Sequence, residues 1–194
     1  MFTTGISVAL AWAVDIRSGK GFTLVELLIV VAIIGIIASI AVPGLLRARM
    51  SGNESSAIGS MRALNSSQHA FSSSCANGYY ASSFTDLHAP SVGGAPFISP
   101  DLMVAAPNKS GYDFTMVVGS DGIVGTVGAC NGVTGPQLVS TYVARANPSA
   151  PGLSGTRYFW TSTLGAIYFD PTGGIAHTAG NTPPTLVPPA GPLQ

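Results

Sequence analysis

Hydrophobic residues in the N-terminal part of the chain form one long run. From Phe22 to Leu46 there are 25 residues, of which only Glu26 is ionisable. A helix rises about 1.5 Å per residue, so this run would extend about 37 Å and could cross a hydrocarbon core of about 30 Å with some tilt. The pattern therefore predicts a membrane-length apolar helix over 22–46.

The pattern changes after residue 46, but nothing indicates that the helix ends there. Residues 51–75 contain no proline, and apolar side chains recur at three- and four-residue steps, although Gln68 interrupts them. Pro43 lacks a backbone N–H and predicts a kink. We expect one helix of about fifty residues, with an apolar half, 22–46, and an amphipathic half, 47–75. The apolar positions of the second half are Ile58, Met61, Leu64, Phe71 and Cys75.

A folded head is predicted after the helix, which makes the fold class α+β. Residues 76–110 are expected to be an irregular αβ-loop, with a short turn from Ser99-Pro100-Asp101 to Ala105. Strand-like runs separated by short turns then predict an antiparallel sheet of about four strands over 111–177, with one face on the amphipathic helix. The proline-rich tail, 178–194, is expected to be extended and poorly ordered. The expected strand segments are Tyr112–Val118, Ile123–Ala129, Leu138–Ala144, Arg157–Thr161 and Ala166–Phe169.

The single carboxylate of the apolar run needs an explanation. A charged side chain costs about 2.5–3.5 kcal/mol at the centre of a membrane, so Glu26 should have a cationic partner. An amino group created by cutting the chain after Gly21 would supply one. Residues 21–26 are Gly-Phe-Thr-Leu-Val-Glu, which resembles the cleavage and methylation motif of type IV prepilins and type II secretion pseudopilins.

That resemblance implies a route of maturation and assembly. A membrane peptidase would cut after Gly21, remove the leader 1–21 and N-methylate Phe22, and Glu26 would pair with the N-terminal amine of a neighbouring subunit. The implied fold is that of a pilin, with the helix kink at Pro43. The implied partners are identical or related pilin subunits, the prepilin peptidase, an inner-membrane assembly platform and, before assembly, membrane lipid. The implied location is the bacterial inner membrane, spanned once, and then a surface pilus or a periplasmic pseudopilus.

Two simpler interpretations of the N-terminal segment fit less well. A secretory signal peptide has a 7–15-residue apolar stretch followed by a small-residue cleavage site, whereas this run is longer and lacks such a site. A plain single-pass anchor leaves Glu26 unpaired. Within the leader, residues 15–21 already supply the short basic segment that prepilin leaders need. We therefore hypothesise that translation starts near Val14.

The charge balance argues against nucleic acid as a partner. The chain has eight acidic and eight basic residues, and removing residues 1–21 takes away one acidic and two basic ones, which leaves seven and six. A near-neutral surface gives no strong attraction to phosphate backbones. Few basic residues lie in the predicted head: Lys109, Arg145 and Arg157, beyond Arg62 on the helix.

Two cysteines remain, Cys75 and Cys130, and only one pairing is possible. For a head exported to the periplasm or the cell surface, a disulfide is the expected state. It would tie the end of the helix to the end of the second expected strand, and two buried free thiols are the alternative. Many pilins instead bracket a segment near the C-terminus, so this placement departs from the commonest pattern of the family.

Other candidate chemistry is sparse, and the sequence predicts neither an enzyme nor a cofactor. The three histidines, at 69, 88 and 177, lack metal-ligand spacing. Asp113, Asp121 and Asp170 could contribute to a calcium loop, but the dense acidic run of such sites is missing. We therefore expect no metal site.

Three functions remain open at this point. The first is a structural subunit of a type IV pilus, and the second is a pseudopilin of a type II secretion system. The third is a minor pilin whose head binds a ligand or DNA, which the shortage of basic residues disfavours. The motif does not separate the first two, although the late Gly155–Phe159 segment resembles pilins of environmental bacteria.

Overall fold

The computed structural model describes residues 21–173, 177–186 and 188–193. Most of the predicted leader and the hypothetical start near Val14 therefore lie outside the described residues. One helix, α1, covers Leu24–Ser74 and continues through Pro43. The chain divides into two compact units between Pro43 and Gly44, so the kink predicted at Pro43 stays a prediction.

The first unit consists, in its described part, of the apolar start of α1. Every residue from 21 to 43 is exposed. The large apolar side chains from Leu24 to Leu46, which reach just beyond this unit, are 45–77% exposed. This helix is long and apolar enough to cross a membrane. Hydrophobicity all round a helix is expected where lipid or other helices surround it.

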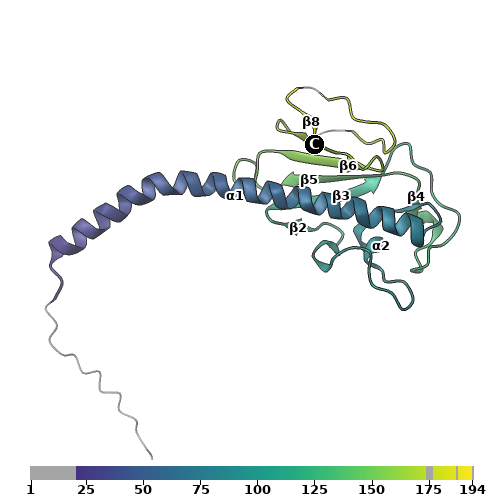
Figure 1. Cartoon of the computed structure of the whole chain (residues 1–194), viewed down its shortest axis with the longest axis horizontal. Helices are drawn as coiled ribbons and strands as arrows, with labels where there is room; N and C mark the ends of the chain where they lie inside the picture. The colour runs from purple at the N-terminus through teal and green to yellow at the C-terminus, as the bar shows by residue number, and fades with distance from the viewer. Residues whose placement is uncertain (1–20, 174–176, 187, 194) are drawn as a thin grey trace, which may run out of the picture. The chain divides into compact units, whose positions relative to one another are not determined.

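The second unit packs the rest of α1 on an antiparallel sheet (Figure 1). The sheet has six strands in the order β2-β3-β5-β6-β7-β8, and every neighbouring pair is antiparallel. Its four longer strands are in the middle, and the two edge strands have two residues each. The strands are β2 (Asn108–Lys109), β3 (Tyr112–Val118), β5 (Tyr142–Pro148), β6 (Tyr158–Ser162), β7 (Ile167–Asp170) and β8 (Gly191–Pro192). The predicted α+β fold, a long helix on an antiparallel sheet, is confirmed.

Alternating burial shows how the sheet meets the helix. In β3, Tyr112 and Phe114 are buried while Asp113 and Thr115 are exposed, as expected for a strand with one face in the core. The register places Phe114 opposite Ala146 of β5, and Ala146 opposite Phe159 of β6. These residues form one hydrophobic core with the inward positions of α1: Ala57, Met61, Leu64 and Phe71.

The segment after β3 corrects two of the strand predictions. Ile123–Ala129 is not a strand, and only Val124 makes an isolated bridge, to Val139. The expected strand Leu138–Ala144 is divided into β4 (Leu138–Val139) and β5, which begins at Tyr142 and runs on to Pro148. At Gly125, an added Cβ would lie 3.0 Å from the Cβ of Leu138, so a side chain there would crowd the close approach of the two segments. β4 pairs with β1 (Tyr80–Ala81) in a separate two-stranded ladder.

The αβ-loop contains more regular structure than expected. A short helix, α2 (Phe84–His88), begins after Ser83, whose side chain accepts a hydrogen bond from the backbone N–H of Asp86. The predicted turn at Ser99 is a 3-10 helix, η1 (Pro100–Leu102), which ends three residues earlier than expected. Outside this loop, a second 3-10 helix, η2 (Gly135–Gln137), precedes β4.

The proline-rich tail is attached to the head, contrary to the expectation of a poorly ordered segment. β8 pairs with Tyr168 and Phe169 of β7, and so extends the sheet beyond the predicted range 111–177. The N–H groups of Gly180 and Asn181 donate to the Asp121 carboxylate at 2.7 and 2.9 Å. The Trp160 indole donates to the carbonyl of His177 at 3.1 Å. Trp160 is buried but lies outside the core shared with α1, and the ring of His177, just before the tail, packs edge-on against it with centroids 5.3 Å apart.

Candidate functional site

The first candidate site is the N-terminal motif, which lies where α1 begins. Gly21 and Phe22 precede the helix, and Phe22 is 87% exposed. A Cβ added to Gly21 would have no atom within 4 Å, so both residues are accessible. Accessible backbone just before a helix is what a peptidase that cuts between these residues would require.

Glu26 caps the helix that it belongs to. One of its carboxylate oxygens accepts hydrogen bonds from the N–H and the hydroxyl of Thr23, both at 2.9 Å. The N–H of Glu26 donates back to the Thr23 hydroxyl at 3.2 Å. This reciprocal arrangement is a capping box, in which Thr23 has the N-cap role and Glu26 is the third helical residue. Within one chain, the carboxylate is therefore bound by Thr23, and it is exposed enough to take a further partner.

The second candidate site is the contact between α1 and the head, where Glu54 is buried. One Glu54 oxygen accepts from the N–H and hydroxyl of Thr156, at 2.9 and 3.1 Å, and from the N–H of Arg157 at 3.3 Å. The other oxygen pairs with Nε of Arg157 at 2.7 Å. Burial raises the pKa of Glu54, but the hydrogen bonds and the Arg157 charge outweigh it and hold the pKa below its usual value.

Two further polar side chains of α1 are buried against the head. The Asn65 amide donates to the Thr161 hydroxyl and the Gly165 carbonyl at 2.9 and 2.8 Å, and it accepts from Tyr142 at 3.0 Å. The Gln68 amide donates to the carbonyl of Ala81 at 2.9 Å and accepts from the N–H of Ala81 at 3.0 Å. Gln68 interrupts the apolar stripe because its side chain forms two hydrogen bonds with the backbone of Ala81, as a neighbouring strand would.

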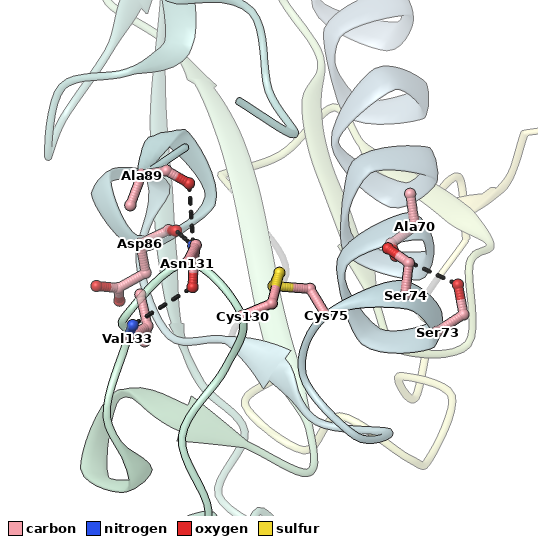
Figure 2. The surroundings of a disulfide bond; sticks show 9 residues. All are labelled: Ala70, Ser73, Ser74, Cys75, Asp86, Ala89, Cys130, Asn131 and Val133. Carbon is pink, nitrogen blue, oxygen red and sulfur yellow. Dashed lines mark hydrogen bonds between the residues drawn. A yellow bond between two sulfur atoms is a disulfide. The ribbon is translucent and has the colours of Figure 1, made fainter. Parts of the chain in front are cut away.

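The predicted disulfide is present and joins the end of α1 to the loop before η2 (Figure 2). Cys75 and Cys130 are linked with a Cα–Cα distance of 4.9 Å, and the Cys130 N–H donates to the Cys75 carbonyl at 3.0 Å. The neighbouring Asn131 side chain donates to the carbonyls of Asp86 and Ala89 at 2.9 and 3.0 Å. The loop is therefore fixed on one side to α1 and on the other to α2.

The remaining candidate residues are not brought together. Asp113 accepts from Asn108, Asp121 from the tail and from Thr141, and Asp170 from Thr172. Among the residues that the structure describes, no three His, Cys, Asp or Glu side chains are grouped as metal ligands would be. The histidines are likewise separate, and His69 lies edge-on to Tyr80.

Sequence reasoning missed the structural roles of Glu54, Asn65 and Gln68. Gln68 was visible only as an interruption of the apolar stripe, and that interruption is the signal that could have identified it. The sequence also carries the signal for α2, because Ser83 followed three residues later by Asp86 is a helix-start pattern.

Comparisons with known proteins concern the N-terminal part. A family model for the prokaryotic N-terminal methylation motif matches residues 16–42. The chain is 58% identical over 38 residues to the type IV wide pilus major component PilA4 of Thermus thermophilus, covering 20% of this chain and 29% of that protein. It is 46% identical over 52 residues to the type IV major pilin protein PilA of Myxococcus xanthus, covering 27% of this chain and 24% of that protein. The matches thus span about a quarter of the length of these relatives. No solved structure matches the chain.

Proposed function

We propose that this chain, a member of the type IV pilin family by its methylation motif and its long helix on an antiparallel sheet, is a structural subunit of a type IV pilus. The observation that carries the proposal is the apolar half of α1. Its large side chains are 45–77% exposed within the single chain. The apolar run follows directly on the motif, and the family model covers both as far as residue 42. So large an apolar surface needs lipid before assembly and other helices afterwards.

Maturation would begin at Gly21. The prepilin peptidase would cut after it and methylate the new amino group of Phe22, at the point where the chain is accessible before α1. The precursor would span the inner membrane once, with the head outside, and an assembly platform in that membrane would add it to the filament. A bulky residue in place of Gly21 should then block processing and leave the precursor in the membrane. On a gel of the membrane fraction, this variant should keep the mobility of the uncut precursor.

Assembly would use the carboxylate of Glu26. Among the residues that the structure describes, this group accepts hydrogen bonds from Thr23, whose donors are neutral. The amine of Phe22 from a neighbouring subunit would add a charge-assisted bond in a low-dielectric helix bundle, and an unpaired carboxylate there would be costly. Glu26→Ala should therefore allow cleavage but impair filament formation. Glu26→Gln is the matched control, since its amide oxygen can still accept the capping hydrogen bonds from Thr23 while its side chain carries no charge. Normal filaments from both variants would refute the pairing.

The alternative within the family is a pseudopilin of a type II secretion system. The two relatives favour the pilus, because their names describe major components of type IV pili. The deciding experiment is to shear filaments from the cell surface and to identify this chain in them by mass spectrometry. Its absence from sheared filaments, together with a secretion defect on deletion of the gene, would favour the pseudopilin.

A further inference from the structure

Five polar residues of α1 are buried, and three of them, Glu54, Asn65 and Gln68, hydrogen-bond to the head through their side chains; the other two are Ser60 and Ser72. Glu54, Asn65 and Gln68 are 6%, 7% and 0% exposed. Glu54 and Asn65 are eleven residues apart, which is close to three helical turns, and Gln68 is nearly one turn further on. We call these three residues the polar row. Around them the same side of α1 contributes four apolar side chains to the core, those of Ala57, Met61, Leu64 and Phe71.

Each member of the polar row binds a different part of the head. Glu54 accepts from Thr156 and Arg157, just before β6. Asn65 contacts Tyr142 of β5, Thr161 of β6 and the turn at Gly165. Gln68 contacts Ala81 of β1 through both its donor and its acceptor. The contacts therefore lie along about four turns of α1 and reach β1, β5, β6 and the residues that flank β6.

Apolar contacts alone would hold the helix on the sheet without fixing its position along its own axis. They are non-directional, and apolar side chains recur at each turn of α1, so a shift by one turn of about 5.4 Å would still bury much of the same surface. Hydrogen bonds are directional and short, so such a shift would break all those of the polar row. It would also leave buried polar groups without partners on both sides of the contact.

We propose that the polar row fixes the axial position of α1 on the head, so that the helix cannot slide by a turn. The Cys75–Cys130 disulfide restrains only the end of the helix, whereas Glu54 acts about twenty residues earlier, nearer to the apolar half. Under the proposed function, the polar row would carry axial force between the helix in the filament core and the head. The restraint on the axial position of α1 does not itself depend on that function.

The test uses pairs of introduced cysteines in the full chain, in membranes, with no filament required. The hydroxyl oxygens of Ser56 and Ser110 are 2.9 Å apart, so Ser56→Cys with Ser110→Cys reports the native position. Ser60 lies one turn further along α1, so Ser60→Cys with Ser110→Cys reports a helix shifted by one turn towards its N-terminus. Both pairs are placed in a Cys75→Ser/Cys130→Ser background, which removes the restraint of the disulfide, and cross-links are counted by mass spectrometry after mild oxidation.

With the polar row intact, the native cross-link should predominate. In the Asn65→Leu/Gln68→Leu variant, the ratio of shifted to native cross-link should rise about tenfold or more. The hydrogen bonds of Asn65 and Gln68 favour the native position over the shifted one, and the loss of each such buried group should change the ratio by about that factor. Leu64→Ala is the matched control. It weakens the same contact by a cavity, with the polar row intact, and should leave the ratio unchanged.

Three results would overturn the proposal. The first is an unchanged ratio in the Asn65→Leu/Gln68→Leu variant. The second is an equal rise in Leu64→Ala, which would assign the effect to general destabilisation. The third is failure of the native cross-link in the background with the polar row intact, which would assign the axial position to the disulfide. None of these results concerns filaments, so the pilus proposal stands or fails separately.

Discussion

The two halves of α1 are one helix by backbone geometry and differ in almost everything that their side chains do. From Leu24 to Leu46 every side chain is exposed, and large apolar ones prevail. From Ser51 to Ser74 the exposed positions are mostly small or polar, and the inward positions form the core of the head. Helical structure alone therefore says little about function. The apolar side chains of the first half have no packing partners among the described residues, whereas the inward side chains of the second half pack against the head.

The sharpest way to break this contrast is to remove a core side chain from the second half. Phe71 is fully buried and packs edge-on against Phe97, with ring centroids 5.3 Å apart. Phe71→Ala should lower the free energy of unfolding of the head by about 3–5 kcal/mol. Ile33→Ala, in the exposed half, should leave it unchanged. Thermal unfolding followed by tryptophan fluorescence in detergent measures both, and equal effects would contradict the division.

The disulfide belongs to the second half alone, and its loss tests the same division. It closes a loop with a sequence separation of 55 residues. In the chain-entropy model such a bond contributes about 4 kcal/mol. Cys75→Ser/Cys130→Ser should lower the free energy of unfolding of the head by about 4 kcal/mol, and therefore its unfolding temperature. Membrane insertion should continue, which cell fractionation measures. A chain that no longer enters the membrane would show that the halves are coupled.

An added charge should be costly at an exposed position of the first half and nearly neutral at an exposed position of the second half. Ile36 and Ser66 are both exposed in the single chain. Ile36→Asp would put a carboxylate in a membrane span at about 2.5–3.5 kcal/mol and should reduce insertion. Ser66→Asp faces water and should be neutral within about 0.5 kcal/mol. Alkaline extraction of membranes separates the outcomes, and full retention of the Ile36→Asp chain would argue that this half does not meet lipid.

The smallest expected effect is a pH dependence confined to the head. The pKa of Glu54 is lower in the folded chain than its ordinary value of 4.5. Its contribution is therefore fully present above pH 4.5 and is lost as the pH falls through the lower folded pKa. Glu54→Gln should flatten the acid side of the stability profile, by an amount on the order of 1 kcal/mol. An unchanged acid slope in this variant would show that other carboxylates dominate.

The sequence predicted most of the helix and the middle of the sheet, for identifiable reasons. The apolar run and the stripe after it are long and periodic, so α1 was expected nearly to its observed end at Ser74. β3 was expected at its observed bounds, because its buried and exposed side chains alternate between two turns. The disulfide followed from having two cysteines in a head expected to be exported.

What the sequence did not predict depends on contacts between distant residues. Ile123–Ala129 has β-branched residues at strand-like positions, but Ile123 donates its N–H to the Ser140 hydroxyl instead of a strand ladder. The tail looked like a disordered proline-rich segment, and nothing local indicates that Asp121 binds it some 60 residues later. The roles of Glu54, Asn65 and Gln68 also depend on their distant partners. Gly21, Phe22 and Glu26 are motif predictions, and their processing and pairing await experiment.

The separation along the chain between Glu54 and its partners also has a consequence for the order of events in the cell. Glu54 is synthesised 102 residues before Thr156, and Asp121 is synthesised 60 residues before Asn181. At about 5–20 residues per second, the helix that carries Glu54 would wait about 5–20 seconds before Thr156 existed. During that interval its head-facing side would be uncovered, while the apolar half could already be in the membrane. Early insertion would hold the nascent chain at the bilayer while the slower, non-local sheet forms.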